Sequence, residues 1–171
     1  MEHSPVVRLN PTQYAHILDK NLNVTRLISG PLTYVRHDHE TLVRGPEEMV
    51  LVLVKPRFYC KVKNPALIKD GKPTLDRNQQ IVLAHGEEEI RLSGPPFPLY
   101  PGEELLEISP LRVVPAQHAL RLEAARDFTD ESGIKRIAGD VWQFLGPATY
   151  VPRVEVKILA EIAATIVEKG S

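Results

Sequence analysis

The sequence lacks most of the features that mark exported and membrane proteins. Its 171 residues include a single cysteine, Cys60, so no disulfide can form within the chain, and a lone thiol suits a reducing compartment. The longest uninterrupted apolar run, Met49–Val54, is too short to cross a bilayer. The first residues have neither the basic nor the apolar region of a signal peptide. These absences predict a soluble cytoplasmic protein. A partly nuclear location is a further expectation that the absences themselves do not supply.

An excess of charge of one sign is also missing. The chain carries 21 Lys and Arg against 22 Asp and Glu, with a net charge of −1, and the two signs are interspersed. Binding to nucleic acids or to anionic membranes usually requires a basic patch. We therefore expect no direct nucleic-acid binding and no membrane binding from this sequence.

Proline and glycine, in contrast, divide the whole chain into short segments. Fifteen prolines and ten glycines are spread along it, and between them apolar and polar residues alternate. Clear examples are "RFYCKVK" (57–63), "HALRLEA" (118–124) and "RVEVKI" (153–158). Alternation with period two is typical of strands with one buried face. The last segment, "LAEIAATIVEKG" (159–170), fits either a strand or a helix, and we favour the strand.

Three stretches of the chain resemble one another. Each begins with a proline and an alternating strand, as in "PTQYAHILD" (11–19), and continues later to Gly-Pro and an aromatic strand. Glycine can end a strand with a freely chosen backbone angle, proline fixes the next angle, and the aromatic packs on a small core. The predicted structural anchors of the repeats are Gly30, Pro31, Tyr34, Gly94, Pro95, Tyr100, Trp142, Gly146, Pro147 and Tyr150.

This pattern predicts an all-β chain of three small antiparallel-sheet repeats. Their boundaries fall near residues 1–54, 55–114 and 115–168. Units this small bury little surface alone and gain stability from their neighbours along the chain. We therefore expect tandem repeats stacked into an elongated rod.

Several longer motifs resemble the N-terminal repeats of the major vault protein family. "YAHILDKNLNVTRLISGPLTYVRHD" (14–38) is similar to the first repeat, and "PFPLYPGE" (96–103) with "ISPLRVV" (108–114) to the second. "AGDVWQFLGPATYVPRVEV" (138–156) is similar to the end of the third. The resemblance extends over nearly the whole chain, although the family's chains are several times longer.

The resemblance implies a structural role. Members of this family assemble, many copies side by side, into the shell of a large hollow cytoplasmic ribonucleoprotein particle, the vault. Their N-terminal repeats form the waist of the barrel, where two half-shells meet. In the complete particle the implied partners are other copies of the protein, the vault poly(ADP-ribose) polymerase, the telomerase-associated protein and vault RNA. The family's shoulder domain and cap helix do not occur in this sequence.

No pattern of residues predicts catalysis, a metal or a cofactor. His37 and His39 in "RHDHE" could hold a metal from one face of a strand, but no third ligand is placed by spacing. Cys60 alternates with apolar neighbours and is interpreted as a core residue rather than a nucleophile. "DFTDESG" (127–133) lacks the spacing of a calcium loop and is interpreted as an acidic turn. No Gly-x-Ser-x-Gly motif or phosphate-binding loop is present.

Two functional hypotheses therefore remain, and neither is an enzyme. The first is a structural shell component that acts through self-association. The alternative is a tandem-β adaptor or scaffold module that grips a protein on an exposed strand edge.

A pH-sensitive interface is a further hypothesis from the sequence. Four of the six histidines (His3, His16, His37 and His39) fall within the first 40 residues. The resemblance assigns that part to the half-shell junction, where facing copies would bring like charges together at acidic pH. His37 and His39 are the residues predicted to act as the switch.

Overall fold

The computed structural model describes residues 5–44 and 48–163, and within these ranges every regular element is a β-strand. The prediction of an all-β chain of small antiparallel sheets is confirmed. Two compact units are present, Met1–Ile108 and Ser109–Ser171. The three predicted repeat boundaries are not tested by this division and stay a prediction.

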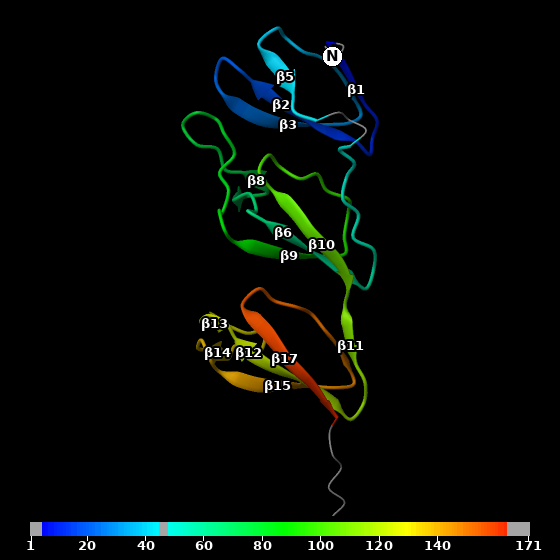
Figure 1. The fold of residues 1–171 in the computed structure, drawn as a ribbon, viewed down its shortest axis with the longest axis vertical. Helices are drawn as coiled ribbons and strands as arrows, with labels where there is room; N and C mark the ends of the chain where they lie inside the picture. Colours follow the sequence, from blue (N-terminus) through cyan, green and yellow to red (C-terminus); the bar gives the residue numbers. More distant parts are fainter. Residues whose placement is uncertain (1–4, 45–47, 164–171) are drawn as a thin grey trace, which may run out of the picture. The chain divides into compact units, whose positions relative to one another are not determined.

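The first part of unit 1 is built from five strands (Figure 1): β1 (Val6–Leu9), β2 (Tyr14–Asp19), β3 (Val24–Ser29), β4 (Leu32–Val35) and β5 (Glu40–Leu42). β2 lies between β3 and β5 in a three-stranded antiparallel sheet, while β1 pairs with β4. The buried residues Val7, Leu9 and Ala15 form the core between these strands.

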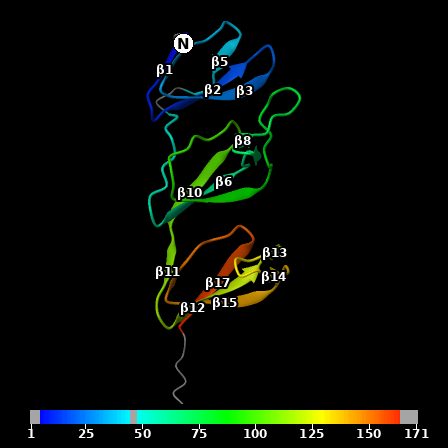
Figure 2. The same cartoon turned by 180° about the vertical axis from the view of Figure 1, so that it is seen from behind.

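The second part of unit 1 repeats this plan: β6 (Phe58–Lys63), β7 (Ile68–Lys69), β8 (Lys72–Pro73), β9 (Glu88–Leu92) and β10 (Glu104–Pro110). β6 is the central strand between β9 and β10, as Figures 1 and 2 show from both sides. The predicted inward face of β6 is confirmed, because Cys60 and Val62 are fully buried and pack with Val52 and Val54. β7 and β8 form a hairpin whose turn residues, Asp70 and Gly71, both have positive φ. Asp-Gly is a preferred sequence for such a turn.

Unit 2 contains the third set of strands: β11 (Arg112–Val114), β12 (His118–Ala124), β13 (Phe128–Thr129), β14 (Lys135–Arg136), β15 (Val141–Leu145), β16 (Ala148–Tyr150) and β17 (Val156–Ala163). β12 is central between β15 and β17, and β11 pairs with β16. Leu120 and Leu122 on β12 form the core with Val114 and Tyr150. The strand that the sequence favoured over a helix at 159–170 is observed up to Ala163 as part of β17. The rest of that prediction lies outside the described residues.

Two side-chain contacts connect the two parts of unit 1. The His16 Nε2 atom lies 2.7 Å from the carbonyl oxygen of Leu99. The amide of Gln80 bonds to both the N–H and the C=O of Thr25, at 2.9 and 3.1 Å. Burial lowers the pKa of His16 below its ordinary value. His16 therefore has a structural role inside unit 1.

Candidate functional site

Buried charge is the most distinctive chemical feature of unit 1. Among the described residues, Glu40 and Glu103 are the charged side chains that are buried, at 3% and 7% exposure. Burying a carboxylate is costly unless it is paired and hydrogen-bonded. Each of the two carboxylates therefore requires hydrogen-bond donors and a cationic partner.

Glu40 sits at the start of β5, opposite Asp19 of β2, and accepts four hydrogen bonds. They come from the Arg26 guanidinium (Nη2 to Oε2, 2.7 Å), the Tyr34 hydroxyl (2.8 and 2.7 Å to the two oxygens) and the His37 backbone N–H (2.8 Å). The guanidinium also contacts the Tyr34 hydroxyl and ring. Burial raises the pKa of the Glu40 carboxyl, but these donors and the arginine charge outweigh it and lower the pKa to about 2.

Glu103 has the same kind of surroundings in the second part of unit 1. Its Oε2 atom lies 2.9 Å from Arg91 Nη2 and accepts the Ala66 N–H at 2.9 Å. Its Oε1 atom accepts the Tyr100 N–H at 2.7 Å. The Arg91 guanidinium lies 4.6 Å from the centre of the Phe97 ring. Both carboxylates thus combine an arginine, an aromatic ring and a backbone N–H three residues before the glutamate.

Strand register shows that these two clusters occupy equivalent positions. Each arginine lies opposite a fully buried residue of the central strand, and each aromatic pairs with a residue of the segment that precedes the central strand. The pairs at the arginine position are Ile17–Arg26, Cys60–Arg91 and, in unit 2, Leu122–Trp142. The pairs at the aromatic position are Val7–Tyr34, Val52–Phe97 and, in unit 2, Arg112–Tyr150. In all three sets the aromatic precedes a third residue by six positions: Glu40, Glu103 and, in unit 2, Val156.

In unit 2 an apolar pair replaces the buried ion pair. Trp142 stands at the arginine position and Val156 at the glutamate position, and both pack against the core of Leu120, Leu122 and Tyr150. Trp142 is partly buried, and the Arg136 guanidinium covers its ring at 4.3 Å. The same fold is therefore stabilised by charge in two sets of strands and by apolar packing in the third.

A pocket of about 540 Å³ lies beside this apolar pair in unit 2. Aromatic side chains, among them Phe128 and Trp142, line it together with Arg136 and Arg153. Both arginines are already paired, with Asp130 at 2.9 Å and with Glu131 at 3.0 Å. The guanidinium charges are thereby balanced, so the pocket has no surplus charge with which to hold an anion.

The two predicted switch histidines lie close together at the β4–β5 corner. The rings of His37 and His39 are stacked, with centroids 5.5 Å apart and planes inclined by 7°. His39 Nε2 is 3.6 Å from Asp19 Oδ2. Across residues 5–44 and 48–163, no group of three His, Cys, Asp or Glu side chains could hold a metal ion. His3, the fourth histidine of this prediction, lies outside the described residues.

The predicted anchor glycines differ in their surroundings. A Cβ on Gly30 would lie 1.8 Å from the Asn10 carbonyl oxygen, and one on Gly146 would lie 2.0 Å from the Pro115 carbonyl oxygen. Gly30-Pro31 and Gly146-Pro147 are both cis. A Cβ on Gly94, in contrast, would meet no atom within 4 Å. The close approach is therefore shared by Gly30 and Gly146 but not by Gly94.

The spacing between the glycine and the packed aromatic residue distinguishes Gly94 from Gly30 and Gly146. Tyr34 and Tyr150 both lie four residues after a glycine, whereas Phe97 lies only three after Gly94. Phe97 packs on the core of its sheet. The predicted anchor Tyr100 is partly buried, and its backbone N–H bonds to Glu103. Phe97 was not among the anchors predicted from the sequence. The spacing from Phe97 to Glu103 equals the six residues from Tyr34 to Glu40, and this equality is the signal that could have identified it. Whether the predicted residues stabilise the repeats stays a prediction.

No helix among the described residues is long and apolar enough to cross a membrane.

Comparison with known proteins gives consistent matches. Two family models described as Major Vault Protein repeat domain match residues 51–108 and 112–153. The chain is 49% identical over 164 residues to major vault protein alpha of Dictyostelium discoideum. It is 47% identical over 167 residues to major vault protein of Danio rerio, and 46% over 167 residues to that of Homo sapiens. These alignments include 95–96% of this chain but only 18–19% of each relative, so the chain spans about a fifth of their length.

Proposed function

Since this chain belongs to the major vault protein repeat family, we propose that it is a wall segment of a vault shell. The family identifies a structural protein rather than an enzyme. The observation that supports the proposal most directly is the reuse of one sheet unit along the chain, with equivalent positions at Glu40, Glu103 and Val156. Repeated units of this size are typical of proteins that present the same surface at intervals.

The position of this segment in the shell is part of the same proposal. By its resemblance to the N-terminal repeats, we assign it to the waist of the barrel, where two half-shells meet. The poly(ADP-ribose) polymerase, the telomerase-associated protein and vault RNA are then partners of the complete particle, not direct ligands of this segment. The proposed location is cytoplasmic, in part nuclear.

Imaging of the full-length parent tests the shell function. Negative-stain electron microscopy of the purified parent is expected to show hollow barrels. Exchange of residues 1–171 for an unrelated all-β segment is expected to abolish whole barrels. Full-length protein that stays monomeric, or barrels that form equally well after the exchange, would contradict the proposal.

We retain the histidine pair as a proposed pH switch at the waist. Protonation would add two positive charges to the β4–β5 corner, where Arg36 already bonds to the Glu40 carbonyl, while Asp19, 3.6 Å from His39 Nε2, would offset part of them. Each exposed pair contributes only tenths of a kcal/mol, but the effect is multiplied over the copies of a ring. His16, by contrast, is engaged with Leu99 inside unit 1, so it is not part of this proposed switch.

The switch has a direct test in the full-length parent. His37 and His39 are replaced by Gln, and the ratio of half-shells to whole shells is followed from pH 7.5 to 5.5, across the titration range of histidine. The variant is expected to stay closed at a pH where the parent opens. Opening at the same pH in both proteins would exclude this pair as the switch.

The adaptor hypothesis is the second candidate, and the open edges of the sheets favour it. β10 and β17 are edge strands, and an exposed edge can accept an added strand from another protein. An adaptor would remain monomeric until it meets its ligand, whereas a wall segment associates with itself. Sedimentation velocity over a range of concentrations separates the two functions.

A further inference from the structure

The edge strand β10 carries exposed side chains on both of its faces, and Glu107 forms an ion pair with Lys61 of β6 at 3.5 Å. The neighbours of β10 in the sheet are limited to β6, and the side chains of Glu104–Ile108 are all exposed. Leu105 faces one side, and Leu106 and Ile108 face the other at 44% and 45% exposure. A strand that is apolar on both faces is normally covered on both. We call Glu104–Ile108 the edge strip.

Unit 2 presents the same feature at the equivalent strand. β17 is the edge of its sheet, and Ile158, Leu159 and Ile162 are exposed on it. Long apolar edges promote pairing with other chains unless something covers them. Because the feature occurs in both units, it reflects the plan of the repeat rather than a local irregularity.

A second exposed surface lies on the β7–β8 hairpin of unit 1. Ile68 is 50% exposed, and the flanking residues Leu67 and Leu75 are exposed as well. Lys69 and Lys72 lie on either side of the turn, with Asp70 between them, so the turn has a net positive charge. We call Ile68–Pro73 the hairpin tip.

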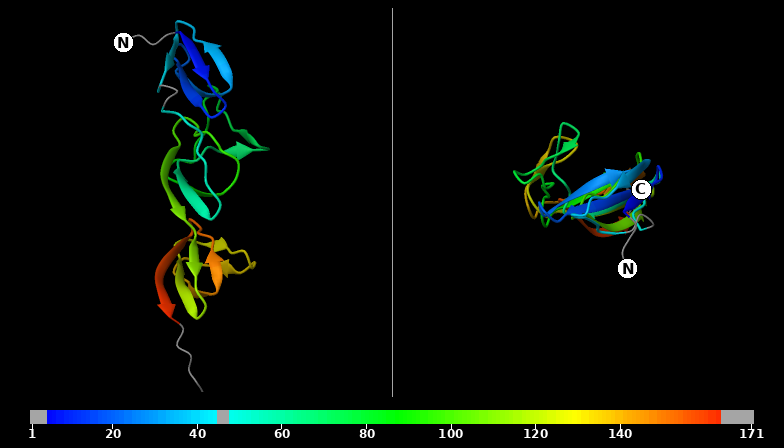
Figure 3. Two further views of the ribbon diagram at one scale, coloured as in Figure 1. Left: turned by 90° about the vertical axis from the view of Figure 1, so that its right-hand side faces the viewer. Right: turned by 90° about the horizontal axis from the view of Figure 1, so that it is seen from above.

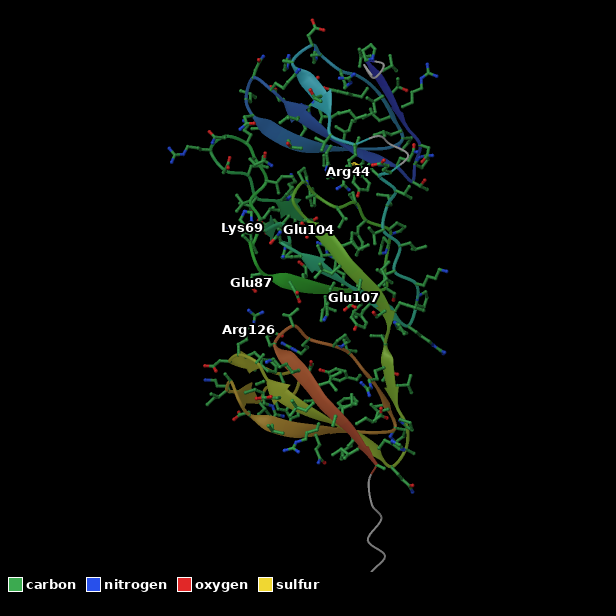
Figure 4. The ribbon with its side chains drawn as sticks, in the orientation of Figure 1. Arg44, Lys69, Glu87, Glu104, Glu107 and Arg126 are labelled. Atoms are coloured by element: carbon green, nitrogen blue, oxygen red, sulfur yellow. The ribbon has the colours of Figure 1, made fainter. Side chains whose placement is uncertain are left out.

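The hairpin tip and the edge strip lie on opposite sides of unit 1. The left view of Figure 3 shows β10 on one side of the sheet and the β7–β8 hairpin projecting from the other. In Figure 4, Glu104 and Glu107 lie along β10, and Lys69 lies on the hairpin. The two surfaces therefore cannot cover each other within one copy.

We propose that the hairpin tip of one copy docks on the edge strip of the next copy along the wall. This inference rests on the proposed shell function and identifies the surfaces that would carry the side-by-side contact. Lys69 or Lys72 would approach Glu104, and the exposed Ile68 would pack on Leu106, which shares a face of β10 with Glu104. The charges are opposite in sign, and apolar side chains are present on both surfaces.

The occupant is a second copy because the two complementary surfaces are on the same chain and on opposite sides of it. Such a contact is heterologous, so its repetition adds further copies, into a ring or an open filament, instead of stopping at a dimer. In unit 2 the hairpin of β13 and β14 is exposed at Ile134 and Ile137, which gives an apolar match for β17. One such strip is smaller than a stable interface of about 1,200 Å², so association of this chain alone is weak.

Charge reversal in the 171-residue chain tests the contact. We expect Lys69→Glu with Lys72→Glu, or Glu104→Lys, to lower the association constant about tenfold in sedimentation velocity. Combination of all three changes in one chain is expected to restore it to within about threefold. Lys20→Glu with Lys55→Glu is the control for the lysine pair, because it makes the same change in net charge at other exposed positions.

Disulfide trapping gives an independent readout. Lys72→Cys protein mixed with Glu104→Cys protein is expected to form a mixed dimer on oxidation, and neither variant alone is expected to do so. The native Cys60 is fully buried, so the introduced thiols are the ones that react. Equal cross-linking of each variant with itself would overturn the heterologous contact.

The outcomes distinguish this inference from the shell function. The docking surfaces are overturned if all the reversals, including the control, weaken association equally. They are also overturned if none of the reversals changes it. If the full-length parent still forms barrels in either case, the shell function stands. A chain that never self-associates or cross-links, with a parent that forms no barrels, overturns both.

Discussion

Replacement of Glu40 by Gln is the most informative perturbation of the fold. The change keeps the size of the side chain but removes the charge that pairs with Arg26. The pKa of Glu40 falls from an ordinary value of 4.5 to about 2. A shift of this size corresponds to about 3 kcal/mol of stabilisation of the folded state at neutral pH. Because the Arg26 side chain is 42% exposed, solvent screening reduces the expected loss to about 2–3 kcal/mol.

The sign of the pH dependence follows from the direction of the shift. Glu40 has a lower pKa in the folded state than in the unfolded state, so its contribution is complete above pH 5 and is lost as the pH falls toward 2. The difference between wild type and Glu40→Gln is expected to shrink from about 2–3 kcal/mol at pH 7 to about 1 kcal/mol at pH 3.

Urea unfolding with two probes isolates this effect. Trp142 is the only tryptophan and lies in unit 2, so its fluorescence reports that unit alone. Far-UV circular dichroism reports both units. Glu40→Gln is expected to move the dichroism transition of unit 1 and to leave the fluorescence transition in place. The exposed Glu48→Gln serves as the matched control. A loss that is equal at pH 7 and pH 3, or equal to that of Glu48→Gln, would refute the ion-pair account.

Three further predictions follow from the same packing. Trp142→Ala is expected to destabilise unit 2 by about 2–3 kcal/mol, less than for a fully buried tryptophan because the ring is partly exposed. Calorimetry that shows an unchanged melting temperature would identify Trp142 as a contact residue instead. Gly146→Ala is expected to destabilise unit 2 by about 2–3 kcal/mol in urea titrations, since its Cβ would meet a carbonyl oxygen at 2.0 Å, whereas Gly94→Ala is expected to cost less than about 0.5 kcal/mol. Arg26→Met combined with Glu40→Val is expected to be more stable than Glu40→Val alone, because no unpaired charge remains buried, and a double variant that is the less stable of the two in urea would contradict this.

The strands were predictable because their signal is local. Alternation over six or seven residues indicates which side of a strand faces the core, and the burial of Cys60, Val62, Leu120 and Leu122 confirms it. The extra residue in β17, Leu159, gave no such signal; it lies where the register against Arg121 and Leu122 of β12 shifts.

The buried ion pairs could not be predicted in the same way. Arg26 occupies an inward position of β3, where the alternating pattern calls for an apolar residue, and its partner Glu40 lies 14 residues further on. The contact between His16 and Leu99 spans 83 residues. Such pairs depend on how the strands fold back on one another, and a pattern within one strand contains no information on that.

The difference between the units bears on any acid response of the proposed shell. Unit 1 draws part of its stability from Glu40, whose contribution begins to fall only below about pH 5. Unit 2 has Trp142 and Val156 at the equivalent positions, and these groups do not titrate. Opening between pH 7 and 5 therefore cannot come from protonation of Glu40, and it requires groups that titrate in that range, such as histidine. Opening that appears only below pH 5, together with loss of the unit 1 dichroism signal, would point to the buried ion pair and to partial unfolding instead of separation at a seam.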